Sequence, residues 1–160
     1  MSAEPTTAPP AKPFRLMPHL DPLNTPFWTG GERGELTFLT CQDDGYRIHP
    51  PAPVCPQCYG RNLAPAAVSG RATVAAFTVN HQAWNPLMPP PYVIAIVEIE
   101  EQPDVRLTTN LVNVEPEAVT IGLPVRVVFE EHEDKDGKVW IPTFEPTDGR
   151  REPASGPGRH

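Results

Sequence analysis

The clearest chemical pattern in this sequence is two short groups of metal-binding side chains. Cys55-Pro56-Gln57-Cys58 has the spacing with which a hairpin tip supplies two thiolates to one tetrahedral zinc ion. Upstream, Cys41 is followed three residues later by Asp44, so the first tip offers a thiolate and a carboxylate. Paired tips of this kind predict a zinc ribbon. Its ion would be structural, because protein ligands fill every position and leave none for a catalytic water.

The fourth ligand admits three interpretations. Asp44 could complete the site, although oxygen binds zinc less well than sulfur beside three thiolates. His49 could turn in instead, or the site could be a relic that has lost its metal. Two other interpretations, small buried cysteines and a rubredoxin-type iron site, are weakened by the Cys-Pro-x-Cys knuckle and by the missing sulfur respectively. Because ligand-capable residues occupy all four positions, we favour structural zinc bound by Cys41, Asp44, Cys55 and Cys58.

No signature of a catalytic site accompanies the metal pattern. The sequence lacks a Gly-x-Ser-x-Gly elbow, a phosphate-binding loop and a His-Glu-x-x-His helix. His81, at the end of a predicted strand, is either a loop residue that reaches a partner's acyl-CoA cleft or, more simply, an ordinary hydrogen-bonded histidine. His132 lies among acidic residues, which indicates a solvated turn. We therefore predict no catalytic residue in this chain.

Apolar residues near a proline-rich loop are candidates for a binding surface. Trp84, Met88 and Tyr92 lie in or beside the loop 86–91, and a stiff apolar loop can dock with little loss of entropy. The alternative is that this loop caps its own barrel. Phe27 and Trp28 face the same choice, and general burial preference favours internal packing for them. The candidate interface set is Phe27, Trp28, His81, Trp84, Met88 and Tyr92.

Short strands separated by turns must position these residues. We predict ribbon strands at 36–40, running into Cys41, and at 46–49, and barrel strands at 71–81, 92–100, 105–111, 123–131 and 138–144. Asp134-Lys135-Asp136-Gly137 predicts a hairpin. Helical turns are expected within 20–31 and 114–120. The run 93–97 is apolar enough to be buried on both faces.

Composition completes the predicted organisation of the 160-residue chain. The fold class is mainly β: a flexible arm over 1–18, a helical segment plus zinc ribbon over 19–68, a five-stranded OB-fold barrel over 69–146 and a disordered tail over 147–160. A net charge of −7 argues against nucleic acid as a partner. With no apolar run of roughly 20 residues and no secretory signal, we expect a cytoplasmic protein without a membrane partner.

The order of several short motifs resembles the DUF35 family of zinc-ribbon OB-fold proteins over about residues 18–147. These motifs are 24–30, Gly34-Glu35-Leu36, the two metal-binding tips, 69–74, 77–79, 91–93 and 121–125. The resemblance implies a non-catalytic partner of thiolase-superfamily enzymes that act on CoA thioesters. The segment 79–92 resembles an actinobacterial branch that accompanies lipid-transfer-type aldolases of steroid side-chain degradation.

Two positions depart from the family pattern: Asp44, where most members have Cys, and 63–65, where an aromatic residue is common. The first bears on metal occupancy and the second on a packing contact between ribbon and barrel. The alternative functions are a free-standing acyl-CoA-binding protein and an OB-fold binder of single-stranded nucleic acid.

Overall fold

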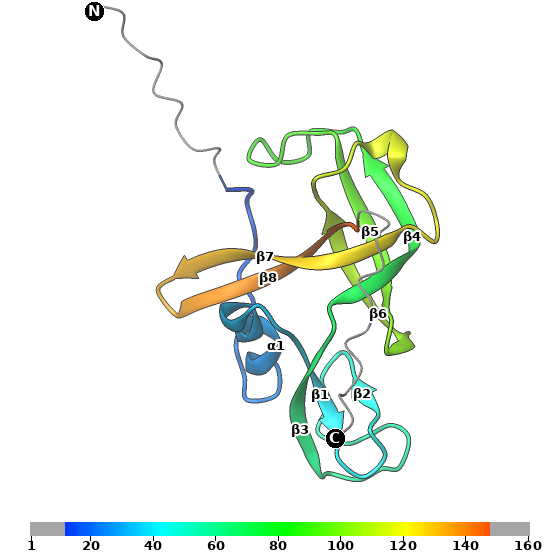
Figure 1. Ribbon diagram of the computed structural model, residues 1–160. Coiled ribbons are helices and arrows are strands. Elements are labelled where there is room, and N and C mark those ends of the chain that lie inside the picture. Colours follow the sequence, from blue (N-terminus) through cyan, green and yellow to red (C-terminus); the bar gives the residue numbers. More distant parts are fainter. Residues whose placement is uncertain (1–11, 148–160) are drawn as a thin grey trace, which may run out of the picture.

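Eight strands and three short helical turns form the fold of residues 12–147, which are the residues that this computed structural model describes (Figure 1). Residues 1–11 of the predicted arm and 148–160 of the predicted tail lie outside them. The predicted fold class is confirmed: a ribbon sheet is followed by a closed five-stranded barrel of OB type.

The ribbon is a three-stranded antiparallel sheet in the order β2-β1-β3. Strands β1 (Leu36–Cys41) and β2 (Arg47–Ile48) confirm the two predicted ribbon strands. Sequence analysis missed β3 (Leu63–Val68), because its one proline and three alanines have low strand propensity. Pro65 is tolerated opposite Leu39 because β3 is an edge strand, where one side of the backbone needs no partner.

The barrel closes in the strand order β4-β5-β6-β8-β7. Its members are the five predicted strands, with slightly different ends: β4 (Arg71–Asn80), β5 (Tyr92–Ile99), β6 (Gln102–Leu111), β7 (Pro124–Asp134) and β8 (Gly137–Pro146). The predicted hairpin is confirmed, since Asp134 pairs with Gly137 and the Asp136 N–H donates to Asp134 Oδ1 at 2.8 Å. Closure comes where β6 and β8 run parallel, with Leu111 opposite Phe144.

Strand β5 shows how the barrel core is built. Val93, Ala95 and Val97 point inward and are buried, whereas Ile96 between them is 36% exposed. The prediction that 93–97 is buried on both faces is therefore wrong. Only one face of a strand in a small closed barrel faces its core, however apolar the strand is.

The predicted helical turns are confirmed by α1 (Thr25–Thr29) and by the 3-10 turns η1 (Gly30–Arg33) and η2 (Pro116–Ala118). α1 buries Phe27 against β1, and η1 packs so closely on the β7–β8 hairpin that a Cβ on Gly31 would lie 2.3 Å from Trp140 Cβ. Neither α1 nor any other helix among residues 12–147 has the length and apolar character to cross a membrane.

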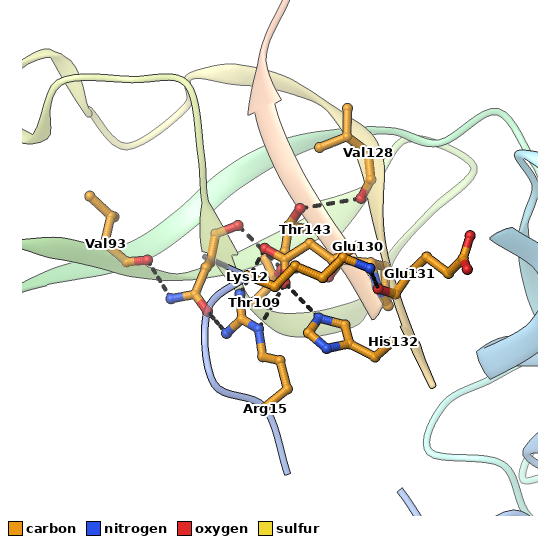
Figure 2. A network of polar contacts seen from close by, with 11 residues as sticks. Lys12, Arg15, Val93, Thr109, Val128, Glu130, Glu131, His132 and Thr143 are labelled. Carbon is orange, nitrogen blue, oxygen red and sulfur yellow. Dashed lines mark hydrogen bonds and ion pairs between the residues drawn. The ribbon is translucent and has the colours of Figure 1, made fainter. Parts of the chain in front are cut away.

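Residues 12–18, here called the N-terminal strap, differ from the predicted flexible arm. They have no regular secondary structure, but Lys12 Nζ donates to Glu131 O at 2.7 Å and the Arg15 guanidinium binds the Glu130 carboxylate (Figure 2). Proline content suggests flexibility, but it cannot reveal a charged partner on a strand 115 residues away.

Candidate metal centre

Two loops of the ribbon bring the predicted metal ligands together. Cys41 ends β1 and Asp44 lies in the turn to β2, whereas Cys55 and Cys58 lie in the segment between β2 and β3. One ligand atom from each of the four residues lies within 4.8 Å of all the others. Cys41 and Cys55 are buried, and Asp44 and Cys58 face solvent. This is the set that the spacing of the two tips predicts.

The spacing of the ligand atoms suits a tetrahedral zinc ion. Cys41 Sγ lies 3.6 Å from Cys58 Sγ, and Cys55 Sγ lies 3.3 Å from Asp44 Oδ2. With Zn–S bonds of about 2.3 Å and Zn–O bonds of about 2.0 Å, tetrahedral ligands would lie about 3.8 Å apart for two sulfurs and about 3.5 Å apart for a sulfur and an oxygen. The ribbon thus carries a Cys/Asp/Cys/Cys cluster suitable for zinc.

The local backbone orients Asp44 toward the cluster. Its Oδ1 accepts a hydrogen bond of 2.9 Å from the Tyr46 N–H, which leaves Oδ2 to face Cys55. This backbone hydrogen bond holds the pKa of Asp44 below its usual value, and hydrogen bonds from the three thiols act in the same direction. The carboxylate is therefore held ionised and with one oxygen directed inward, as a monodentate ligand requires.

The neighbouring ligand groups change the pKa of Cys58. At Cys58 the Gly60 N–H lowers the pKa, but the hydrogen bond with Cys41, desolvation and the nearby Asp44 outweigh it and raise the pKa to about 12. Four anionic ligand atoms at these distances repel one another, and a divalent cation neutralises that repulsion while displacing the thiol protons.

His49 is not part of this cluster. Its ring packs between Phe27 and Phe38, with centroid distances of 5.2 and 5.5 Å, and burial lowers its pKa. A histidine held in this aromatic cluster is not free to supply a fourth ligand, so the alternative site with His49 is not supported.

Hydrogen bonds join the ribbon to the barrel beside the metal centre. The Arg47 N–H donates to Gln102 Oε1 at 2.8 Å, and Gln102 Nε2 donates back to Arg47 O at 3.0 Å. Tyr46 Oη donates to Asp104 Oδ2 at 2.8 Å. An open cleft of about 500 Å³ lies at this junction, and its lining includes the carboxylates of Asp44 and Asp104. Two carboxylates disfavour the phosphate groups of a CoA ligand there.

The predicted interface residues separate into two groups. Phe27 is buried, with its ring centroid 4.9 Å from that of Trp28, which is itself half-buried against the core. Phe27 must be removed from the interface set, and its burial agrees with the internal packing that burial preference favours for it. By contrast, His81 and Trp84 are exposed, and Met88 and Tyr92 are half-buried, in or next to the β4–β5 loop (residues 81–91). His132 lies in strand β7 beside Glu130, half-buried, and not in the solvated turn predicted for it.

A rubredoxin-like zinc ribbon followed by an OB barrel defines a class of proteins, and other proteins of known sequence belong to it. Residues 28–64 match the family described as "ChsH2, rubredoxin-like zinc ribbon domain", and residues 66–130 match "ChsH2, C-terminal OB-fold domain". A "DUF35 domain-containing scaffold protein" of Methanocaldococcus jannaschii is 35% identical over 111 residues, which cover 68% of this chain and 77% of that protein. The chain belongs to the DUF35 family.

Two longer relatives and one solved structure are also similar. The "Probable enoyl-CoA hydratase alpha subunit" of Thermomonospora curvata is 30% identical over 84% of this chain, and the "3-oxo-4,17-pregnadiene-20-carboxyl-CoA hydratase alpha subunit" of Mycobacterium tuberculosis is 36% identical over 72% of it. The matches span only 41% and 36% of those two proteins. A structure titled "Ltp2-ChsH2(DUF35) aldolase" superposes with a TM-score of 0.70 at 29% identity, covering 81% of this chain and 98% of that chain.

Proposed function

We propose that this chain is a non-catalytic partner subunit that binds and stabilises a thiolase-superfamily enzyme acting on acyl-CoA thioesters. The observation that carries the proposal is the match to nearly the whole of a chain in a structure titled as an Ltp2–ChsH2 aldolase. The relatives named as scaffold proteins support the same role. The resemblance of segment 79–92 to the actinobacterial branch, together with the relative named as a 3-oxo-4,17-pregnadiene-20-carboxyl-CoA hydratase alpha subunit, supports the finer proposal that the partner is a lipid-transfer-type aldolase of steroid side-chain degradation.

The side chains of this chain support a scaffold better than a catalyst. The proposed zinc ligands Cys41, Asp44, Cys55 and Cys58 fill a tetrahedral shell, so the ion braces the ribbon and leaves no position for a substrate. Across residues 12–147, no histidine is hydrogen-bonded to a serine, threonine or cysteine, which is the pairing that activates a nucleophile. The reacting groups would then belong to the partner. None of the three cysteines forms a disulfide, which suits a reducing cytoplasm.

Co-expression tests this function. The thiolase-superfamily enzyme encoded nearest to this chain is produced with and without it, and the two preparations are compared by size-exclusion chromatography and by aldol cleavage of the acyl chain of an acyl-CoA substrate. We expect a complex that elutes as one species, and an enzyme that loses activity or solubility when the chain is left out. Full activity of the enzyme alone, with no co-elution, would refute the proposal. Calorimetric titration of this chain alone with the same thioester separates a partner subunit from a free-standing acyl-CoA binder.

A further inference from the structure

Arg15 fastens the N-terminal strap to the barrel wall. Its Nε and Nη2 donate to the two carboxylate oxygens of Glu130 at 2.9 and 3.0 Å (Figure 2). Its Nη1 donates to Asn110 Oδ1 at 2.6 Å. The Arg15 and Glu130 side chains are only 15% and 20% exposed. A two-pronged ion pair shielded from water in this way is directional and strong, so it fixes the strap at one point across β6 and β7.

The strap in turn meets the β4–β5 loop. The Phe14 N–H donates to Leu87 O at 3.5 Å, which places one segment beside the other. The loop is held by its own hydrogen bonds: Leu87 N–H donates to Asn85 Oδ1 at 2.9 Å, and Trp84 Nε1 donates to Asn80 Oδ1 at 3.0 Å. Strap and loop therefore lie side by side, and hydrogen bonds hold the backbone of the loop and the indole of Trp84.

This surface exposes large apolar side chains that the fold does not cover. Leu16 is 84% exposed, Trp84 77% and Leu87 62%. Together with Phe14, they make up four of the eight large hydrophobic residues that are exposed among residues 12–147. Apolar side chains that are open to water on a backbone held by hydrogen bonds favour docking, because binding buries them without first ordering the backbone.

We propose that the N-terminal strap and the β4–β5 loop form one composite docking surface for the partner enzyme, with Arg15 as its positioning residue. The inference rests on the proposed function and names the surface that the function uses. The strap passes beside the β7–β8 hairpin (Figure 1), and Lys12 bonds to it. This hairpin forms the negatively charged edge of the proposed docking surface. The hairpin end carries Glu133 and Asp134, which are exposed and form no ion pair within residues 12–147. The partner surface that fits is apolar at its centre and basic at the edge facing this hairpin.

Affinity measurements on surface variants test the proposal. The purified enzyme from the co-expression experiment is titrated with wild-type chain, Leu16→Glu and Leu87→Glu, and with Ile121→Glu as the matched control, because Ile121 is 72% exposed in the turn before β7. All three substitutions add a charge at an exposed site and should leave the fold intact. We expect each of the first two to weaken binding by about tenfold or more, and the control to change it by less than about twofold.

A second pair of variants tests the role of Arg15. Arg15→Gln is compared with Arg71→Gln, whose ion pair with Glu100 is exposed to solvent. We expect faster amide hydrogen exchange in the strap and weaker enzyme binding only for Arg15→Gln, with unchanged far-ultraviolet circular dichroism for both. If the wild-type chain binds but Leu16→Glu and Leu87→Glu bind equally well, the docking surface is wrong while the proposed function stands. If the wild-type chain does not bind at all, the proposed function fails, and the docking surface fails with it.

Discussion

Replacing Asp44 by alanine is the most direct perturbation of the metal centre. The substitution removes the Oδ2 that lies 3.3 Å from Cys55 Sγ and also the Oδ1 that accepts the Tyr46 N–H, so the site loses a ligand and the contact that orients it. The three cysteines remain, and water can enter because Asp44 and Cys58 face solvent. A site built from three thiolates and water still holds zinc, but less tightly.

The expected loss of zinc affinity in Asp44→Ala follows from the number of ligands that share the binding energy. Structural zinc sites bind with about 10–16 kcal/mol shared among four ligands, and removing only an outer-shell contact typically costs about 10–100-fold in affinity. Exchanging a directly bound carboxylate for water should therefore weaken zinc binding by about 100-fold. Asp44→Cys should act in the opposite direction, because zinc prefers a fourth thiolate to an oxygen.

Competition with a chromophoric chelator measures these affinities, and elemental analysis gives the zinc content, which we expect to be about one ion per wild-type chain. Asp43→Ala is the matched control, since this neighbouring carboxylate bonds Asn62 at 2.9 Å and lies outside the cluster. Asp44→Ala that holds zinc as tightly as wild type would exclude Asp44 as a ligand. A wild-type chain that takes up no zinc would instead support the relic interpretation.

Three further predictions concern the stability of the fold, each measured by urea unfolding. Phe38→Ala should lower the free energy of unfolding by about 3–5 kcal/mol because Phe38 is 1% exposed, while Ile121→Ala should change it by less than about 0.5 kcal/mol; equal effects would contradict the core assignment. Gly31→Ala should cost about 1–3 kcal/mol, because the new Cβ would lie 2.3 Å from Trp140 Cβ, and an unchanged midpoint would contradict this close packing. Burial lowers the pKa of His49, so the unfolded chain takes up that proton first as the pH falls. Stability should therefore drop from about pH 6.5 downward and level off below the folded pKa, and this drop should be smaller in His49→Phe; parallel pH profiles would refute it.

Local sequence chemistry was sufficient to predict most of the elements. The turn residues at 134–137 and the apolar strand runs determine local structure, so six of the seven predicted strands needed only small changes at their ends, and the two-residue β2 is shorter than predicted. The metal cluster was predictable for the same reason, since Cys-x-x-Cys and Cys-x-x-Asp spacings place ligands on two neighbouring loops. Strand β3 was not predictable, because its alanines and proline acquire strand structure only from pairing with β1.

The sites that sequence analysis missed depend on long-range contacts. Arg15 and Glu130 are separated by 115 residues, and nothing near either residue indicates that they pair. For Phe27, general burial preference favoured internal packing, and α1 does bury it; for Trp84 the sequence left both alternatives open, and the β4–β5 loop leaves it exposed. Whether Trp84 is covered depends on the course of the β4–β5 loop, which its residue type does not reveal.

The two halves of the structure obtain their stability from different sources. The barrel cluster contains fifteen buried apolar residues, including Leu36 and Phe38 from β1, whereas the ribbon cluster contains only Cys41, Ile48 and Cys55. Two of those three are proposed ligands, so the ribbon tip has almost no hydrophobic core apart from its metal centre. The proposed docking surface lies on the barrel and is held by Arg15 on β6 and β7. Removal of zinc should thus disorder the ribbon tip and the cleft between ribbon and barrel. The strap and the β4–β5 loop should keep their positions without zinc.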